Sequence, residues 1–220
     1  MKASRALLFD FNGVIIDDEE QHREALTEVL DGYGIALSRE RYYDEFLGFD
    51  DRGCFRHAFK VAGLDLKPGE VARAIAQKTA AYSRALETGM KLVPGAVDFI
   101  EQTWRSGIQM AVVSGALRRE IEMVLKQCQI LDLFDAIVAA EDVTACKPSP
   151  EGYLYGLDLL GAESDGSIAI EDSRPGIEAA LQAGVRVTAL TTSYPAGELA
   201  RAALVWDDFS GHSPDELPWN

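Results

Sequence analysis

The sequence predicts an α/β protein, a doubly wound parallel sheet with an all-helical domain inserted after its first strand. Three observations support this prediction. A short apolar run at residues 6–9 stops at a turn-forming cluster, residues 10–13. Residues 17–87 show helical patterns without a strand-like run. From about residue 93 onward, helical and strand-like segments alternate regularly.

The first strand is the run Ala6-Leu7-Leu8-Phe9. Consecutive apolar residues ended by a turn signal are typical of a strand buried on both faces, as in a parallel sheet. Asp10 then lies at the carboxyl end of this strand, the edge at which open α/β sheets bind their ligands. Asn12 lies two residues further on. An aspartate at this position would suit general acid–base catalysis, but the amide of asparagine cannot exchange a proton near neutral pH.

The inserted region comes next in the chain. Its segments with helical periodicity cover residues 20–30, 39–46, 51–61 and 70–86. So many helices exceed what a crossover between two parallel strands needs. We therefore assign residues 17–87 to a helical domain and residues 1–16 with 88–220 to the sheet domain. A helical lid over the strand ends would exclude water from a site there.

The remaining strands and helices alternate along the rest of the chain. The expected helices cover residues 94–105, 118–129, 151–160 and 175–183. The expected strands cover residues 108–113, 136–139, 167–170, 185–190 and 203–206. Alternation of this kind produces a mostly parallel sheet with helices on both faces.

Composition restricts the class of function. The net charge of −15 argues against a nucleic-acid partner, because phosphate backbones need a basic surface. A small anionic substrate is compatible with it, since a few lysines and N–H groups make a pocket locally positive. The short N-terminal apolar run predicts neither a signal peptide nor a membrane span. The three cysteines lack metal-type spacing and fit a reducing compartment, so we expect a cytoplasmic protein without a membrane partner.

Polar segments follow several of the predicted strands and therefore meet at one edge of the sheet. They are Asp10 with Asn12, Ser114-Gly115, Cys146-Lys147-Pro148 and Glu171-Asp172. Carboxylates, a cation, a hydroxyl and a glycine turn together suit a divalent cation and a phosphoryl group.

The same segments resemble a known family. The stretches F-D-F-N-G-V-I-I-D-D-E-E-Q-H, V-V-S-G, K-P-S-P and I-E-D-S-R-P-G-I-E-A-A occur in the order seen in the haloacid dehalogenase superfamily. The helical insertion resembles the type 1 cap of its phosphoglycolate phosphatase-like and β-phosphoglucomutase-like members. The resemblance implies a Rossmann-like core and Mg²⁺-dependent hydrolysis of a small phosphorylated metabolite, phosphoglycolate or a sugar phosphate. A sugar-phosphate mutase and a non-catalytic phosphometabolite-binding homologue are the alternatives, and we expect a monomer or weak homodimer.

The resemblance also implies roles for individual residues. Asp10 would be the nucleophile that attacks phosphorus to give an aspartyl-phosphate, and Lys147 would neutralise charge between nucleophile and phosphate. Mg²⁺ would be held by Asp10, Asp172 and the main-chain carbonyl of Asn12, with Glu171 bound directly or through water.

Phosphate oxygens would be bound by the Ser114 hydroxyl and by the N–H groups of Phe11, Asn12 and Gly115. In family phosphatases an aspartate matching Asn12 protonates the leaving group and then activates water, help typically worth ~10²–10⁴-fold. Three explanations for the asparagine compete: another proton carrier, a binding-only homologue, or a deliberate Asp-to-Asn substitution. We favour a natural enzyme with attenuated or rerouted acid–base chemistry.

Two residues of the inserted domain complete the candidate site. His22 has the family's spacing after the first motif and would act near the leaving group when the domain closes, with an ordinary polar histidine as the equal alternative. Arg52 lies in residues 48–52, which match the family's substrate-specificity loop. It would contact an anionic or hydroxylated end of the substrate, or else be a solvated arginine behind a helix N-cap.

Overall fold

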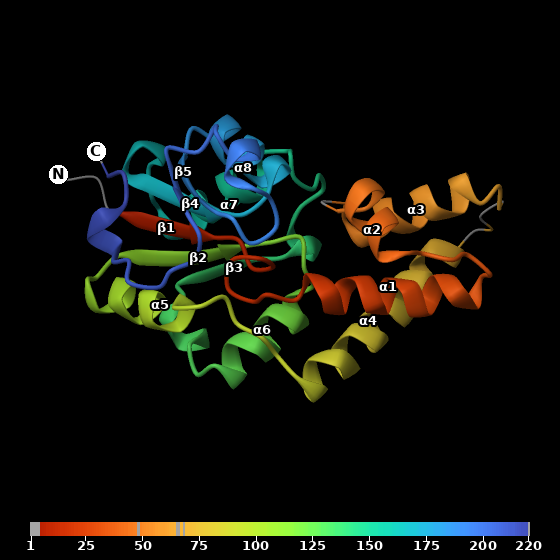
Figure 1. Ribbon diagram of the computed structural model, residues 1–220. Helices are drawn as coiled ribbons and strands as arrows, with labels where there is room; N and C mark the ends of the chain where they lie inside the picture. The colour runs from red at the N-terminus through yellow and green to blue at the C-terminus, as the bar shows by residue number, and fades with distance from the viewer. Residues whose placement is uncertain (1–4, 48, 65–66, 68, 220) are drawn as a thin grey trace. The chain divides into compact units, whose positions relative to one another are not determined.

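The chain folds into two units. The computed structural model describes residues 5–47, 49–64, 67 and 69–219 of the 220-residue chain. Its Cα positions divide into a sheet unit, Met1–Asp17 with Lys91–Asn220, and a helical unit, Asp18–Met90 (Figure 1). The domain boundaries given above, after residues 16 and 87, stay a prediction.

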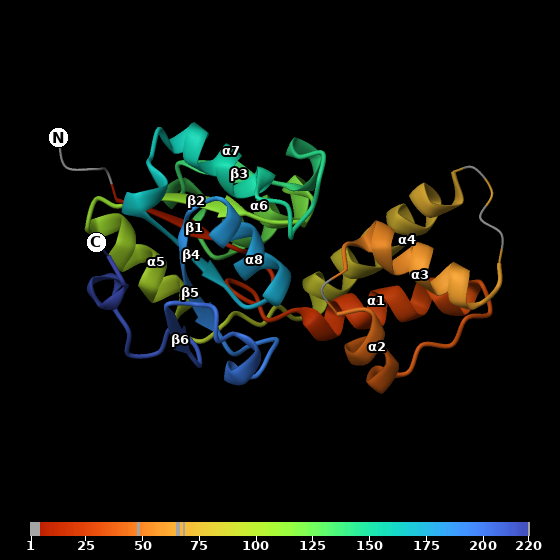
Figure 2. The same cartoon turned by 90° about the horizontal axis from the view of Figure 1, so that it is seen from above.

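A parallel sheet of six strands forms the centre of the sheet unit in the described residues. Its strands are β1 (Ala6–Phe9), β2 (Gln109–Val113), β3 (Ala136–Val138), β4 (Ser167–Glu171), β5 (Arg186–Leu190) and β6 (Leu204–Trp206). They lie in the order β3-β2-β1-β4-β5-β6, which can be followed from above in Figure 2. Leu8 of β1 pairs with Ala111 on one side and with Ala169 on the other. This central position explains why every residue of β1 is buried.

Helices cover both faces of this sheet. They are α5 (Ala96–Arg105), α6 (Arg118–Gln127), α7 (Glu151–Leu160) and α8 (Arg174–Gln182). In Figure 1, α5 and α6 lie on one face of the sheet, and α7 and α8 lie on the other. The predicted doubly wound α/β fold is thus confirmed. The expectation that the second of these helices continues to residue 129 was wrong, because Gln129 has a left-handed φ of 59° that ends a right-handed helix.

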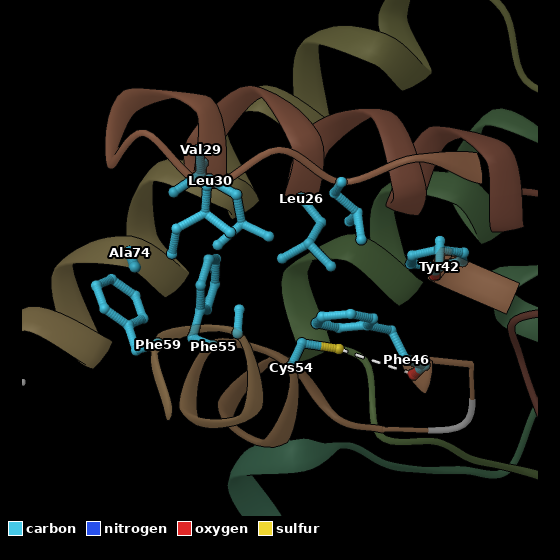
Figure 3. Packing of buried hydrophobic residues seen from close by; sticks show 12 residues of the cluster. Leu26, Val29, Leu30, Tyr42, Phe46, Cys54, Phe55, Phe59 and Ala74 are labelled. Atoms are coloured by element: carbon cyan, nitrogen blue, oxygen red, sulfur yellow. Dashed lines mark hydrogen bonds between the residues drawn. The ribbon is translucent and has the colours of Figure 1, made fainter. Parts of the chain in front are cut away.

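The helical unit contains α1 (Glu19–Gly32), α2 (Arg39–Glu45), α3 (Asp51–Val61) and α4 (Glu70–Thr88). Apolar side chains of α1 and α3 form much of its core. Figure 3 shows Leu26 and Leu30 of α1 pointing toward Phe55 and Phe59 of α3. In the described part of the chain, none of the helices combines the length and the apolarity needed to cross a membrane.

The helix α3 begins within residues 48–52, the segment that resembles the family's substrate-specificity loop. Asp50 caps this helix, because its Oδ1 accepts a hydrogen bond of 2.7 Å from the Gly53 N–H. Arg52 lies in the first turn and is exposed. Gly48, which belongs to the same segment, lies outside the described residues.

Candidate active site

The turn after β1 positions the first carboxylate. Asp10 follows the strand directly, and the half-buried Asn12 forms an isolated bridge with Ile16. Gly13 has a φ of +71°, a conformation that favours glycine. A Cβ atom at residue 13 would lie 1.9 Å from Asp172 Oδ2. Glycine is therefore required both by the backbone of the turn and by the close approach of Asp172.

Lys147 links two carboxylates at this edge of the sheet. Its Nζ lies 2.9 Å from Asp10 Oδ2 and 2.6 Å from Glu171 Oε1. Glu171 is the last residue of β4 and is 0% exposed, and Asp10 is 8% exposed. Ion pairs removed from water in this way interact more strongly than pairs on a surface. The structure thus brings together side chains from three separate segments, while their chemical roles stay predictions.

Asp172 completes an acidic cluster with Asp10 and Glu171. One carboxylate oxygen from each of these residues lies within 4.8 Å of the others. When all are ionised, the cluster has three negative charges against the one positive charge of Lys147, an excess of two. Uncompensated buried charge is unfavourable. A divalent cation therefore fits this site in charge as well as in its oxygen ligands.

Burial also controls protonation in the cluster. It raises the pKa of Asp10 from 3.8 to about 7, because desolvation outweighs the opposing attraction of Lys147, and the Glu171 carboxylate raises it further. Burial acts to lower the pKa of Lys147, but Asp10 and Glu171 outweigh it and hold that pKa above its usual value. Near neutral pH, Lys147 is therefore charged while Asp10 titrates.

Groups predicted to bind phosphate lie around a small cavity. Ser114 follows β2 and is 6% exposed. Together with Gly115 and Lys147 it lines a cavity of about 20 Å³, enough for one water molecule. The Phe11 N–H donates a hydrogen bond of 2.7 Å to Asp10 Oδ1. This N–H, which is predicted to donate to a phosphate oxygen, therefore donates to the Asp10 carboxylate in this structure.

The half-buried His22 belongs to a polar cluster within the helical unit. Its Nδ1 lies 2.5 Å from Lys78 Nζ, and its Nε2 lies 3.1 Å from Asp18 Oδ2. The imidazole stacks on the Tyr82 ring with 4.2 Å between centroids. Lys78 is 4% exposed and also lies 2.7 Å from Asp51 Oδ1. These contacts all lie within the helical unit, and both alternatives for His22, a role near the leaving group and an ordinary polar histidine, stay predictions.

Side chains that the sequence analysis missed hold the carboxylates in place. Glu171 accepts hydrogen bonds from Tyr153 Oη at 2.6 Å and from Ser173 Oγ at 3.0 Å. Asp172 accepts a hydrogen bond from Ser193 Oγ. Ser193 follows β5, so the rule that located the other strand ends could have found it. Tyr153 lies inside α7, where helical spacing alone does not distinguish it from a core residue.

Gly176 gives a direct test of how closely α8 packs against this cluster. A Cβ at residue 176 would lie 2.0 Å from the Glu171 carboxylate. At a position inside a helix, alanine is usually more stabilising than glycine by roughly 1 kcal/mol. Here we expect Gly176→Ala to lower the free energy of unfolding by about 1–3 kcal/mol, because the carboxylate must shift. Urea unfolding measures the change.

Gly32→Ala in α1 is the matched control for this prediction. Among the described residues, nothing lies within 4 Å of the Cβ that it would add. We expect this variant to be neutral or stabilising. Equal free energies of unfolding for the two variants would contradict the close packing of Gly176 on Glu171.

Comparison with known proteins gives consistent matches over most of the chain. A family model described as haloacid dehalogenase-like hydrolase matches residues 7–190. Protein CbbY from Rhodobacter capsulatus is 29% identical over 208 residues, which cover 90% of each chain. Fructose-1-phosphate phosphatase YqaB from Escherichia coli K12 is 31% identical over 182 residues, covering 81% of this chain and 92% of its own.

A solved structure agrees with these sequence matches. It is an Asp-to-Asn variant of CbbY from Rhodobacter sphaeroides in complex with xylulose-(1,5)bisphosphate. The two chains superpose with a TM-score of 0.88 at 28% identity, covering 96% of this chain and 98% of the other. The similarity in structure therefore extends over nearly the full length of both chains.

Proposed function

This chain belongs to the haloacid dehalogenase-like hydrolase family, and from that premise we propose that it is a phosphatase of a small phosphorylated metabolite. Sugar phosphates and phosphoglycolate are the proposed substrate class. The observation that carries the proposal is the buried contact of Asp10 with Lys147, beside Glu171 and Asp172. A nucleophile, a cation and metal-binding carboxylates are the groups that phosphoryl transfer uses.

In the proposed reaction, an Asp10 carboxylate oxygen attacks phosphorus, and the bond between phosphorus and the ester oxygen breaks. This step leaves an aspartyl-phosphate and an alkoxide that must take up a proton. A water oxygen then attacks phosphorus, the bond to Asp10 breaks, and inorganic phosphate leaves. The proton lost by the attacking water balances the proton gained by the alkoxide. Lys147, 2.9 Å from Asp10, would stabilise negative charge on the transferred group.

Asn12 is expected to limit the rate of both steps. Its amide neither donates a proton to the alkoxide nor accepts one from water near neutral pH. We therefore propose slow turnover that is fastest for esters whose leaving groups need no proton. The same residue favours a second candidate function, a protein that binds a phosphorylated metabolite without hydrolysing it.

Phosphate release tests the two candidates against each other. The substrates are p-nitrophenyl phosphate and a panel of sugar phosphates, sugar bisphosphates and phosphoglycolate, each assayed with Mg²⁺ and with EDTA. Release that requires the cation supports a phosphatase. Cation-dependent binding of inorganic phosphate, without release from any ester, supports the binding protein. If the protein neither releases phosphate nor binds it, both proposals are overturned.

Mg²⁺ is the proposed cofactor. Asp10, Asp172 and the main-chain carbonyl of Asn12 would hold it, with Glu171 bound directly or through water. When bound, the ion would neutralise negative charge on the carboxylates and on the phosphoryl group. The excess negative charge of the buried cluster supports this assignment.

The pH dependence of stability tests this cation site. The pKa of Asp10 in the metal-free protein is about 7, above its ordinary value of 3.8, so the folded state binds more protons than the unfolded state between these values. Stability from this group is therefore present below about pH 4 and is lost as the pH rises through about 7. We expect Mg²⁺ to raise the melting temperature more at pH 8 than at pH 5.5, because protons compete with the cation for Asp10.

Thermal melts with EDTA or with Mg²⁺ measure this difference. Mg²⁺ at 100 times its dissociation constant would add about 2.7 kcal/mol of stability. A potassium salt of matched ionic strength is the control for general screening. Equal shifts in melting temperature at the two pH values would contradict binding at Asp10.

A further inference from the structure

We propose that Tyr153 is a positioning residue of this site: its phenol fixes the Glu171 carboxylate, and through that carboxylate it fixes the Lys147 ammonium beside Asp10. The inference deepens the proposed function and rests on it for its kinetic consequence. Tyr153 lies in α7 and is 0% exposed. Its Oη donates a hydrogen bond of 2.6 Å to Glu171 Oε1.

Tyr153 and Lys147 act on the same carboxylate oxygen. Lys147 Nζ lies 2.6 Å from Glu171 Oε1, and it lies 5.4 Å from the centroid of the Tyr153 ring. The ring is therefore close enough for a cation–π attraction to the ammonium. The ring of Tyr153 thus lies close to the Lys147 ammonium, and its hydroxyl binds Glu171, the ion-pair partner of that ammonium.

The second oxygen of Glu171 is held by different donors. Its Oε2 accepts hydrogen bonds from Ser173 Oγ at 3.0 Å and from the Asp172 N–H at 3.2 Å. The Ser173 N–H also donates to Oε2, at 3.4 Å. Donors from Lys147, Tyr153, Asp172 and Ser173 thus contact both oxygens of this carboxylate. Glu171 is therefore a fixed reference point for the ammonium, and its rotation would break several hydrogen bonds at once.

The hydroxyl of Tyr153 contributes something that a phenyl ring cannot. Phenylalanine at this position would keep the apolar contacts of the ring but would remove the hydroxyl donor from Glu171 Oε1, which keeps its contact with Lys147. Hydrogen bonds to an ionised acceptor are among the stronger ones in proteins. Without this one, the carboxylate is expected to lose its fixed orientation and to hold the ammonium less firmly beside Asp10. Because Lys147 acts on the transferred group, kcat should fall more than KM changes.

The test compares the wild-type chain with Tyr153→Phe and with Tyr155→Phe, using two measurements. Tyr155 is the matched control, a tyrosine of the same helix that is 39% exposed. The first measurement is steady-state hydrolysis of p-nitrophenyl phosphate with Mg²⁺. The second is acetylation of lysines in the metal-free protein, quantified by mass spectrometry at Lys147 and at Lys78. Lys78 is 4% exposed and belongs to the helical unit, so it reports general loosening.

For Tyr153→Phe we expect a roughly tenfold fall in kcat and faster acetylation of Lys147 with no change at Lys78. Tyr155→Phe should match the wild type in both measurements. Where the wild type turns over substrate, two results would overturn the positioning role. They are a fall in kcat without faster acetylation of Lys147, and faster acetylation of Lys147 without a fall in kcat. Faster acetylation of both lysines, as unfolding would produce, would overturn it in favour of a purely structural role. If the wild type releases no phosphate, the proposed function fails, and the acetylation of Lys147 still decides the role of Tyr153.

Discussion

Replacing Asp10 with asparagine is expected to reduce phosphate release by ~10³-fold or more, because the variant lacks the proposed nucleophile. The amide has nearly the shape of the carboxylate, but its oxygen is a much weaker nucleophile and carries no charge. Lys147 keeps its 2.6 Å contact with Glu171, so we expect the site to stay ordered. Removing one charge from a cluster with excess negative charge should leave the metal-free protein equally stable or more stable.

Steady-state hydrolysis of p-nitrophenyl phosphate with Mg²⁺ measures the loss, and thermal melts of both chains check the fold. Asp132→Asn is the matched control, since it makes the same chemical change at an exposed position. We expect this control to retain wild-type activity. Activity close to that of the wild type in Asp10→Asn would contradict the assignment of the nucleophile.

The position of Asp10 in the fold could be predicted because two simple patterns coincide there. Ala6-Leu7-Leu8-Phe9 is apolar without interruption, which a strand buried on both faces requires, and the observed β1 covers these same residues. Polar residues that directly follow such strands must lie at one edge of a parallel sheet. Asp10 directly follows β1, and Glu171 ends the neighbouring strand β4, while Lys147 contacts both from the loop between β3 and α7.

Other parts of the site depend on tertiary contacts that no local pattern encodes. Tyr153 has the spacing of a core residue, and its bond to Glu171 arises from how α7 packs on the sheet. The contact of His22 with Lys78 joins residues 56 positions apart on α1 and α4. The end of a helix is also hard to predict from local sequence. The apolar periodicity predicted a helix to residue 129, and it does not indicate the left-handed backbone conformation of Gln129. Sequence pattern thus located strand ends well and hydrogen-bond partners poorly.

Asn12→Asp is expected to raise kcat by ~10²–10⁴-fold for esters with poor leaving groups, the usual value of general acid–base catalysis. The introduced carboxyl group could protonate the alkoxide and then take a proton from the attacking water. For p-nitrophenyl phosphate we expect a smaller gain in the first step, because its leaving group is stable without a proton. The main-chain carbonyl at position 12 is unchanged, so the affinity for Mg²⁺ should be similar in both chains.

Parallel assays of the two chains with a sugar phosphate and with p-nitrophenyl phosphate measure this difference between leaving groups. The double variant Asp10→Asn with Asn12→Asp should be inactive, because an acid without a nucleophile cannot start the reaction. A large gain in Asn12→Asp would mean that the remaining groups of the site are already arranged for hydrolysis and that one amide limits the rate. No gain, in a wild-type chain that nevertheless turns over, would mean that another group carries the proton. His22, held between Lys78 and Asp18, would then be the first residue to replace.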